Sequence, residues 1–277
     1  MPPFYEGIVA MPRNSPLPGR GKESYSIQSV ENALAVLEAL CEEGEEFRIS
    51  QLSEKLGMNK TSIFRLLATF ENRGYVEREK GSGKYRLGLS AYEMGQKFLS
   101  RMGLLRKARP VVERLVRQCN EAVYIGLRRN DEILFLDMVD TSQQVKIVSF
   151  LGNRYPLASN AAGKVILAHS LPEEPKPPSG KPFSPPCPVA PAELLLIRRQ
   201  GFCLENGGPL GEGVVNLAVP LFDTDGEIPG CLCLVGPSFR MSPERIQDDI
   251  LPSLKEASNI ISSKLGYLGY YLGTDRI

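Results

Sequence analysis

The feature that most limits what this chain can fold into is a pair of short amphipathic helices joined by a tight turn. Ser50 can cap the first helix, which runs through Leu52 and Leu56 and ends at Gly57. Asn59 can cap the second, whose apolar side chains share one face: Ile63, Leu66, Leu67 and Phe70. A preceding helix is predicted by the spacing of Val30, Ala33, Leu34, Leu37 and Leu40. Three helices with this turn between the last two are typical of a helix–turn–helix.

The second helix of the pair presents a polar surface opposite its apolar face. At about 100° per residue, that surface collects hydroxyl groups and a cation, with Lys60 near the start of the helix: Thr61, Ser62, Arg65 and Thr69. Such a helix can enter the major groove of double-stranded DNA, where Arg reads guanine edges and Ser, Thr and Lys contact phosphates. The alternative interpretation is an amphipathic helix whose polar face is solvated.

The sequence after this helix, YVEREKGSGKYRLG, alternates like two short strands around a glycine-rich turn. Three cations lie at or beside its tip: Lys80, Lys84 and Arg86. Residues 48–109 contain 14 Lys or Arg against 5 Glu, an excess of +9, whereas the chain from residue 110 onward has 16 against 19 Asp or Glu, or −3. Positive charge on a hairpin suits the sugar–phosphate backbone or the minor groove. We therefore expect a winged helix–turn–helix that binds DNA, although a solvated hairpin fits the same pattern.

The back of the chain has the pattern of a mixed α+β domain. The runs VYIGLR, ILFLDMV and VKIVSF are rich in β-formers and too closely joined for intervening helices, which favours antiparallel pairing. Two segments are predicted to be helices, AAGKVILAHS and AELLLIRRQ. Two more, VVNLAVPLF and EIPGCLCLV, are predicted to be strands on either side of a turn at 223–226. We expect a sheet with helices on one face.

Composition changes along the chain suggest the domain boundaries. Residues 1–24 hold several prolines and lack the apolar core of a secretory signal, and we expect a disordered tail there. We expect a DNA-binding domain at 25–88, a linker helix at 89–106 and a second domain at 107–277. The linker carries an apolar stripe that can pack on its own domain or on a second chain: Tyr92, Met94, Phe98 and Leu99. We favour the second chain, giving a dimer or a dimer of dimers.

Composition also argues against membrane proteins and most enzymes. No apolar run reaches the roughly 18 residues of a membrane-spanning helix, so we expect a cytoplasmic protein. His169 is the only histidine and no Cys-x-x-Cys pair occurs, which leaves little for acid–base catalysis or metal binding. We expect no catalytic residue, no metal ligand and no cofactor. Lys164, in ASNAAGKV, lacks the flanking glycine and hydroxyl residues of a phosphate-binding loop.

Two alternative functions depend on cysteines. A thiolate among Cys187, Cys203, Cys231 and Cys233 could be the nucleophile of an enzyme with His169 as base. Cys231 and Cys233 are also two residues apart on one predicted strand, so both side chains would lie on one face, as a thiol or metal sensor requires. Buried strand residues are the simpler interpretation.

A resemblance to the IclR-type (isocitrate lyase regulator) family of bacterial transcriptional regulators is carried by SIQSVENALAVLEAL, ISQLSEKLGMNKTSIFRLLATFENRGYVER and YRLG. It extends into the back of the chain through GNRYPLASNAAGKVILA and GVVNLAVPLFDTDGEIPGCLCLVGP. The resemblance implies a winged helix–turn–helix, a linker helix and a C-terminal effector-binding domain with a GAF-like sensor architecture. It also implies a sequence-specific regulator that binds operator DNA and a small metabolite.

The resemblance further implies an effector site between the start of the AAGK helix and the strands VVNLAVP and CLCLVGP. Free backbone amides of Ala161 and Ala162 would suit a carboxylate there, so an organic acid is the expected effector. The positions that match pocket-lining family positions are Asn206, Asn216, Cys233 and Val235. The sequence departs from the family around LENGGP, where the family usually has a pair of acidic residues. Here Glu205 is the nearest acid, and its neighbour Asn206 is neutral. Simple packing of small residues is the alternative.

Overall fold

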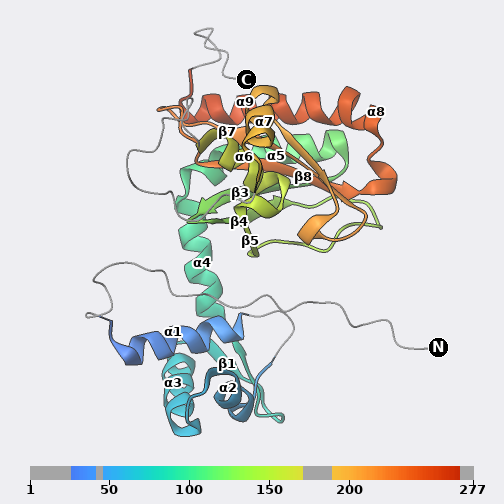
Figure 1. Cartoon of the computed structure of the whole chain (residues 1–277). Helices are drawn as coiled ribbons and strands as arrows, with labels where there is room; N and C mark the ends of the chain where they lie inside the picture. Colours follow the sequence, from blue (N-terminus) through green and yellow to red (C-terminus); the bar gives the residue numbers. More distant parts are fainter. Residues whose placement is uncertain (1–25, 42–45, 171–188, 269–277) are drawn as a thin grey trace, which may run out of the picture. The chain divides into compact units, whose positions relative to one another are not determined.

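The computed structural model describes residues 26–41, 46–170 and 189–268. The chain divides into two compact units between Phe98 and Leu99 (Figure 1). The tail expected at 1–24 lies outside the described residues, as does Cys187. In the part of the chain that is described, no helix has both the length and the apolar character needed to cross a membrane.

The first unit is the expected winged helix–turn–helix. Its elements are α1 (Gln28–Leu40), α2 (Ile49–Leu56), α3 (Lys60–Asn72), β1 (Val76–Arg78), β2 (Tyr85–Leu87) and the start of α4 (Leu89–Arg101). The antiparallel β1–β2 hairpin sets Arg78 opposite Tyr85, and Phe47 adds a bridge to Tyr85. The helices and the hairpin enclose one apolar core: Val36, Ala39, Leu40, Phe47, Leu52, Ile63, Leu67, Val76 and Tyr85.

The turn between α2 and α3 follows from local hydrogen bonding. Gly57 ends α2 in the left-handed region at φ 64°, and the Asn59 side chain accepts a hydrogen bond from the Ser62 N–H at 2.8 Å. The cap predicted for Asn59 is therefore confirmed. The cap predicted for Ser50 is wrong: α2 begins earlier, after Arg48, whose N–H donates to the Gln51 side chain at 2.8 Å.

The second unit is built on an antiparallel sheet with strand order β5-β4-β3-β8-β7-β6. Its strands are β3 (Ala122–Arg129), β4 (Glu132–Val139), β5 (Arg154–Pro156), β6 (Cys203–Asn206), β7 (Val214–Leu221) and β8 (Gly230–Pro237). Its helices are α5 (Gly103–Cys119), α6 (Ala161–Ser170), α7 (Pro191–Gln200), α8 (Pro243–Arg245) and α9 (Leu251–Leu265), with a π-helical segment at Ile246–Ile250. The hairpin predicted around 223–226 is confirmed, since Leu221 pairs with Gly230.

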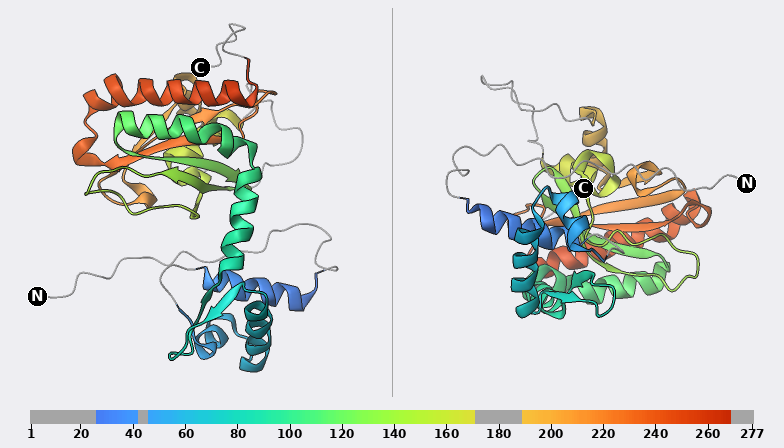
Figure 2. Two further views of the ribbon diagram at one scale, coloured as in Figure 1. Left: turned by 180° about the vertical axis from the view of Figure 1, so that it is seen from behind. Right: turned by 90° about the horizontal axis from the view of Figure 1, so that it is seen from below.

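Helices cover both faces of this sheet, so the prediction of helices on one face is wrong. On one face, α5 and α9 run side by side, with α9 against β7 (Figure 2). On the other, α6 packs against β7 and β8 and also contacts α7. Alternate residues of β3 point to opposite faces of the sheet. Val123 and Ile125 pack in the core beneath α5 and α9, and Tyr124 packs in the core beneath α6. Every residue of β7 and β8 is buried, which removes the polar alternation of a half-exposed strand.

Two further expectations differ from the structure. The strand predicted for VKIVSF (145–150) is absent; these residues lie in a loop in which Val148 is 78% exposed and Phe150 is buried. Instead β5 pairs with β4. The single helix predicted for 89–106 is interrupted at Met102, where extended backbone separates α4 from α5.

Candidate functional site

The outer face of α3 presents the side chains that the sequence predicted to face DNA. Lys60, Thr61, Arg65 and Thr69 are exposed and Ser62 is half-buried, while Ile63 and Leu67 on the opposite face are fully buried. The Thr69 hydroxyl donates to the Arg65 carbonyl at 2.9 Å, so it also has a partner within the helix. The Arg65 side chain is exposed beside it. This face combines a cation with hydroxyl groups on a capped helix, which suits base and phosphate contacts.

Phe64 is a residue of this face that the sequence analysis missed. Its side chain is 52% exposed and does not belong to the core formed by Ile63 and Leu67. The available signal was its spacing, because Phe64 follows Thr61 by three residues and lies at the edge of the apolar stripe rather than at its centre.

The β1–β2 hairpin carries the three predicted cations in different surroundings. Lys80 is exposed next to the tip. Lys84 lies 3.9 Å from the Glu46 carboxylate, and Arg86 lies 3.1 Å from Glu77, its direct partner in the register. Ion pairs this exposed contribute little to stability, so phosphates can replace the carboxylates.

The predicted effector residues converge at the start of α6, with one exception. Ala161, Ala162, Cys233 and Val235 belong to the core beneath α6, and Asn216 is buried among them. The Asn216 Oδ1 accepts a hydrogen bond from the Ala161 N–H at 3.0 Å. Asn206 is exposed on the edge strand β6, at its end.

Two backbone amides at the N-terminus of α6 already donate to side chains of the protein. Besides the bond from Ala161 to Asn216, the Gly163 N–H donates to the Asn160 side chain at 3.0 Å. The expectation of a free Ala161 amide is therefore wrong. The sequence could not show this, because Asn216 is 55 residues away in the chain. An acid that binds the Ala161 amide has to displace the Asn216 side chain.

The lysine of the AAGK segment has a structural role in an ion-pair cluster. The Lys164 Nζ lies 2.8 Å from Glu193 on α7 and 2.6 Å from Glu205 on β6. Burial alone would lower the pKa of Lys164, but the hydrogen bonds to Glu193 and Glu205 outweigh burial and raise it. The lysine therefore ties α6 to two neighbouring elements, and Glu205, the acid nearest Asn206, is already paired.

Three of the cysteines named in the alternative functions lie among the described residues, and all three are buried: Cys203, Cys231 and Cys233. Burial raises the pKa of Cys203 and Cys231 to about 12 and that of Cys233 well above its ordinary range. Neutral thiols are poor nucleophiles and poor metal ligands. Among the described residues there is no cluster of three His, Cys, Asp or Glu side chains that could hold a metal.

His169 makes packing contacts and does not contact any of the cysteines proposed as a nucleophile among the described residues. Its Nδ1 contacts the Val165 carbonyl oxygen at 2.9 Å, its ring meets Phe222 edge to face, and its Nε2 is buried without a hydrogen-bond partner among the described residues. Burial lowers the pKa of His169. The ring therefore favours the neutral form of a packed side chain.

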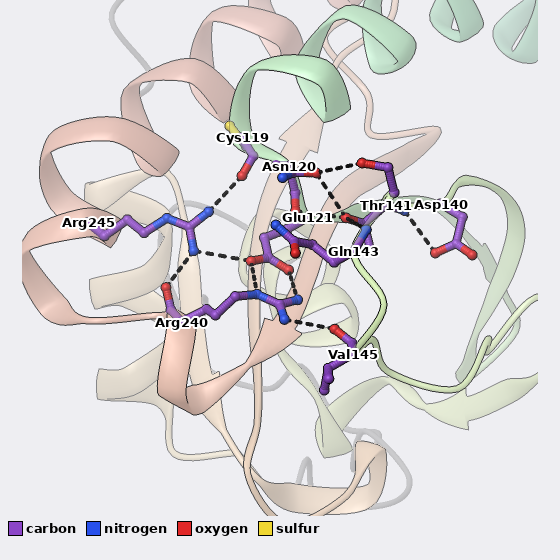
Figure 3. Close-up of polar contacts among 10 residues, drawn as sticks. Cys119, Asn120, Glu121, Asp140, Thr141, Gln143, Val145, Arg240 and Arg245 are labelled. Carbon is purple, nitrogen blue, oxygen red and sulfur yellow. Dashed lines mark hydrogen bonds and ion pairs between the residues drawn. The ribbon is translucent and has the colours of Figure 1, made fainter.

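A buried charge cluster around Glu121 fixes the start of β3, and the sequence analysis did not identify it. Glu121 is 1% exposed and accepts two hydrogen bonds from Arg240 at 2.8 Å and one from Arg245 at 3.1 Å (Figure 3). Arg240 also donates to the Val145 carbonyl at 2.7 Å, and Arg245 donates to the Cys119 carbonyl at 2.7 Å. The hydrogen bonds from Glu121 raise the pKa of Arg240. The cluster joins the end of α5 to the 140–153 loop and to the segment after β8.

Comparisons with known proteins cover both units. A family model described as the IclR helix-turn-helix domain matches residues 29–80, and one described as bacterial transcriptional regulator IclR C-terminal matches residues 96–263. The chain is 33% identical over 257 residues to the HTH-type transcriptional regulator KdgR of Escherichia coli K12, covering 90% of this chain and 97% of that protein.

Solved structures show the same fold. The crystal structure of the Thermotoga maritima IclR is 27% identical, with a TM-score of 0.68, over 87% of this chain and 100% of that one. An IclR homologue from Microbacterium hydrocarbonoxydans, crystallised with 4-hydroxybenzoate, is 23% identical with a TM-score of 0.67, over 86% of this chain and 98% of that one. At 23% identity, the similarity to the Microbacterium structure shows that the two chains share a fold and nothing more.

Proposed function

The chain belongs to the IclR family of bacterial transcriptional regulators, which bind DNA and carry a C-terminal effector domain, and we propose which of its side chains perform these two tasks. The observation that carries the proposal is the exposed face of α3, which lies inside the segment matched by the family's helix–turn–helix model. Arg65 reads a guanine in the major groove of operator DNA. The residues that contact phosphates and neighbouring base edges are Ser50, Asn59, Lys60, Thr61, Ser62 and Thr69.

The β1–β2 hairpin contributes contacts that do not depend on base sequence. Lys80, Lys84 and Arg86 meet the sugar–phosphate backbone or the minor groove, with the exposed pairs to Glu46 and Glu77 giving way to phosphates. Their contribution should therefore be strongly salt-dependent.

A binding experiment separates base reading from backbone contact. Fluorescence anisotropy would measure affinity for a duplex selected from random-sequence DNA and for an unrelated duplex, at several salt concentrations. Arg65→Ala should lose about 1–3 kcal/mol on the selected duplex and relax its base preference, whereas Lys84→Ala should weaken both duplexes alike and reduce the salt dependence. Arg199→Ala removes another exposed cation, from α7, and should change neither. Unchanged binding by Arg65→Ala would remove the recognition role of α3.

We propose that two copies of the chain associate through the first unit. Large apolar side chains that its core does not bury lie on α1, at its N-cap and on α4: Ile27, Val30, Leu34, Leu89, Tyr92, Met94 and Phe98. Large exposed apolar side chains on α1 and α4 are the candidates for an association surface in this unit. Association presents two copies of α3 to two half-sites, as a roughly palindromic operator requires.

We propose that the effector is a small organic acid bound at the start of α6. The helix N-terminus favours negative charge, and the Asn216 side chain that now bonds to Ala161 N–H is the group that a carboxylate replaces. Ala162, Cys233 and Val235 surround this position, and Asn206 lies on the neighbouring strand β6. The acid changes operator affinity only if it binds one arrangement of the paired DNA-binding units more tightly than the other. The size of the change is set by the difference between its affinities for the two arrangements.

Calorimetry with a panel of monocarboxylate and dicarboxylate metabolites tests the effector site. Asn216→Asp keeps an acceptor for the Ala161 N–H but adds negative charge, so it should abolish binding of any acid that the wild type binds. Cys233→Ser should only change the affinity. Equal affinity of Asn216→Asp and wild type for the same acid would contradict this site. We expect saturable binding without conversion, since the buried thiols are protonated.

A further inference from the structure

Phe64 is an apolar side chain on the part of α3 that is otherwise polar. Thr61, Phe64, Arg65 and Ala68 recur at spacings of three and four residues and so form one continuous face. Thr61, Phe64 and Arg65 are exposed and Ala68 is half-buried, whereas Ile63 and Leu67 on the other side are fully buried. The exposed face therefore carries the Thr61 methyl, the Phe64 ring and the Ala68 methyl, with Arg65 on the other side of Thr61 from Phe64.

The position of Phe64 along α3 is suited to reaching base edges. It lies little more than one turn after the Asn59 cap, and the first turns of a recognition helix are those that contact bases in the major groove. Its ring has no hydrogen-bond donor or acceptor, so it offers a base edge only an apolar surface. In the major groove that surface matches one group, the C5-methyl of thymine.

We propose that Phe64 is a specificity-determining residue that packs against the C5-methyl group of a thymine next to the guanine read by Arg65. This rests on the proposed function of α3 and adds a base preference to it. Single exposed apolar residues ordinarily need no explanation. Phe64 differs because it lies at the edge of the proposed DNA-reading face, next to Thr61 and Ala68, where covering its exposed ring with an apolar group would be favourable.

Replacing thymine by uracil tests this contact directly, because the replacement removes the methyl group and keeps the base pair. The probe is a duplex selected from random-sequence DNA by the wild-type protein, with each thymine changed in turn to uracil. One thymine per half-site should weaken wild-type binding about fourfold when changed, as expected for about 0.8 kcal/mol per buried methyl group. Phe64→Ala should bind the parent duplex more weakly than wild type does and should bind the uracil duplex no more weakly than the parent.

Arg65→Ala is the matched control, since it should keep the uracil effect while losing discrimination at the guanine. Phe64→Leu should keep part of the effect. The inference is overturned if Phe64→Ala and wild type show the same loss at every thymine, or if Phe64→Ala changes only the assembly state in sedimentation. Failure of the wild-type protein to select any sequence would instead overturn the proposed function of α3. Circular dichroism should show an unchanged fold for Phe64→Ala because this side chain lies outside the core.

Discussion

Gly163 is the residue at which α6 has no room for a side chain. An added Cβ would overlap the Leu157 carbonyl oxygen and would lie 2.5 Å from the Leu157 Cα. These are backbone atoms that cannot move without shifting the turn at Leu157–Ser159. The glycine of the AAGK segment therefore allows close packing of α6, while its lysine pairs with Glu193 and Glu205.

Gly163→Ala should consequently destabilise the second unit. We expect the free energy of unfolding to fall by about 1–3 kcal/mol or more, as for other overpacked sites. Gly95→Ala is the matched control, because Gly95 is exposed in α4 with open space around its Cβ position. That substitution should stabilise by about 0.5–1 kcal/mol. Thermal unfolding followed by circular dichroism measures both, and shifts in the same direction would contradict the packing argument.

Burial of Cys231 should make the free energy of unfolding fall as the pH rises into the alkaline range. Its pKa is raised from an ordinary value of 9.0 to about 12, so the thiol remains protonated in the folded chain where the unfolded chain has already ionised. This contribution is fully present below pH 9 and is lost as the pH rises from 9 towards 12. The loss should reach about 1.4 kcal/mol at pH 10. Urea unfolding at pH 8 and pH 10 should show a smaller drop for Cys231→Ala than for wild type; equal drops would contradict the assigned pKa.

Residues whose partners are close in sequence could be predicted, and those with distant partners could not. The Asn59 cap uses the Ser62 amide three residues away, and the sequence identified it. Asn216 was picked out by family resemblance, but its bond to the Ala161 amide depends on how α6 packs on β7. Glu121 is 119 and 124 residues away from its partners Arg240 and Arg245, so no local pattern marks the cluster.

At the level of elements, the start of α3 depends on one side chain. Asn59→Ala should lower the free energy of unfolding of the first unit by about 1 kcal/mol, because the Ser62 amide loses its acceptor. Asn59→Asp keeps the acceptor and places negative charge at a helix N-terminus, so stability should be retained. The same negative charge should weaken DNA binding. Urea denaturation and fluorescence anisotropy together check this, and equal stability of Asn59→Ala and wild type would contradict it.

The strands of the second unit were predicted better than their layering. Runs such as VVNLAVPLF identify a strand by composition, and β7 lies within that run. A strand buried on both faces has no alternation, so its sequence does not show how many helical layers cover it. The loop at 145–150 has the composition of a strand, but pairing with β4 is taken by β5 instead. Composition alone could not show which of the two segments pairs with β4 at this edge of the sheet.

At the level of the whole molecule, the first unit exposes several large apolar side chains on α1 and α4. Tyr92 and Phe98 on α4 are 63% and 64% exposed, and Val30 and Leu34 on α1 are both 50% exposed. The spacing of Val30 and Leu34 predicted the helix, but periodicity identifies an apolar stripe without saying what covers it. A second copy would bury these side chains and bring two recognition helices to one operator.

Charged residues on α4 should therefore separate the copies without unfolding either one. The double variant Tyr92→Asp, Phe98→Asp should sediment at the 30.6 kDa of one chain, whereas wild type should sediment at a multiple of that mass. Its operator affinity should fall steeply, since each α3 then binds its half-site alone. Leu196→Asp is the control, because Leu196 on α7 is 57% exposed and lies outside the proposed surface. A wild-type protein that sediments as a single chain, or a double variant that stays assembled, would show that these side chains face solvent rather than a second copy.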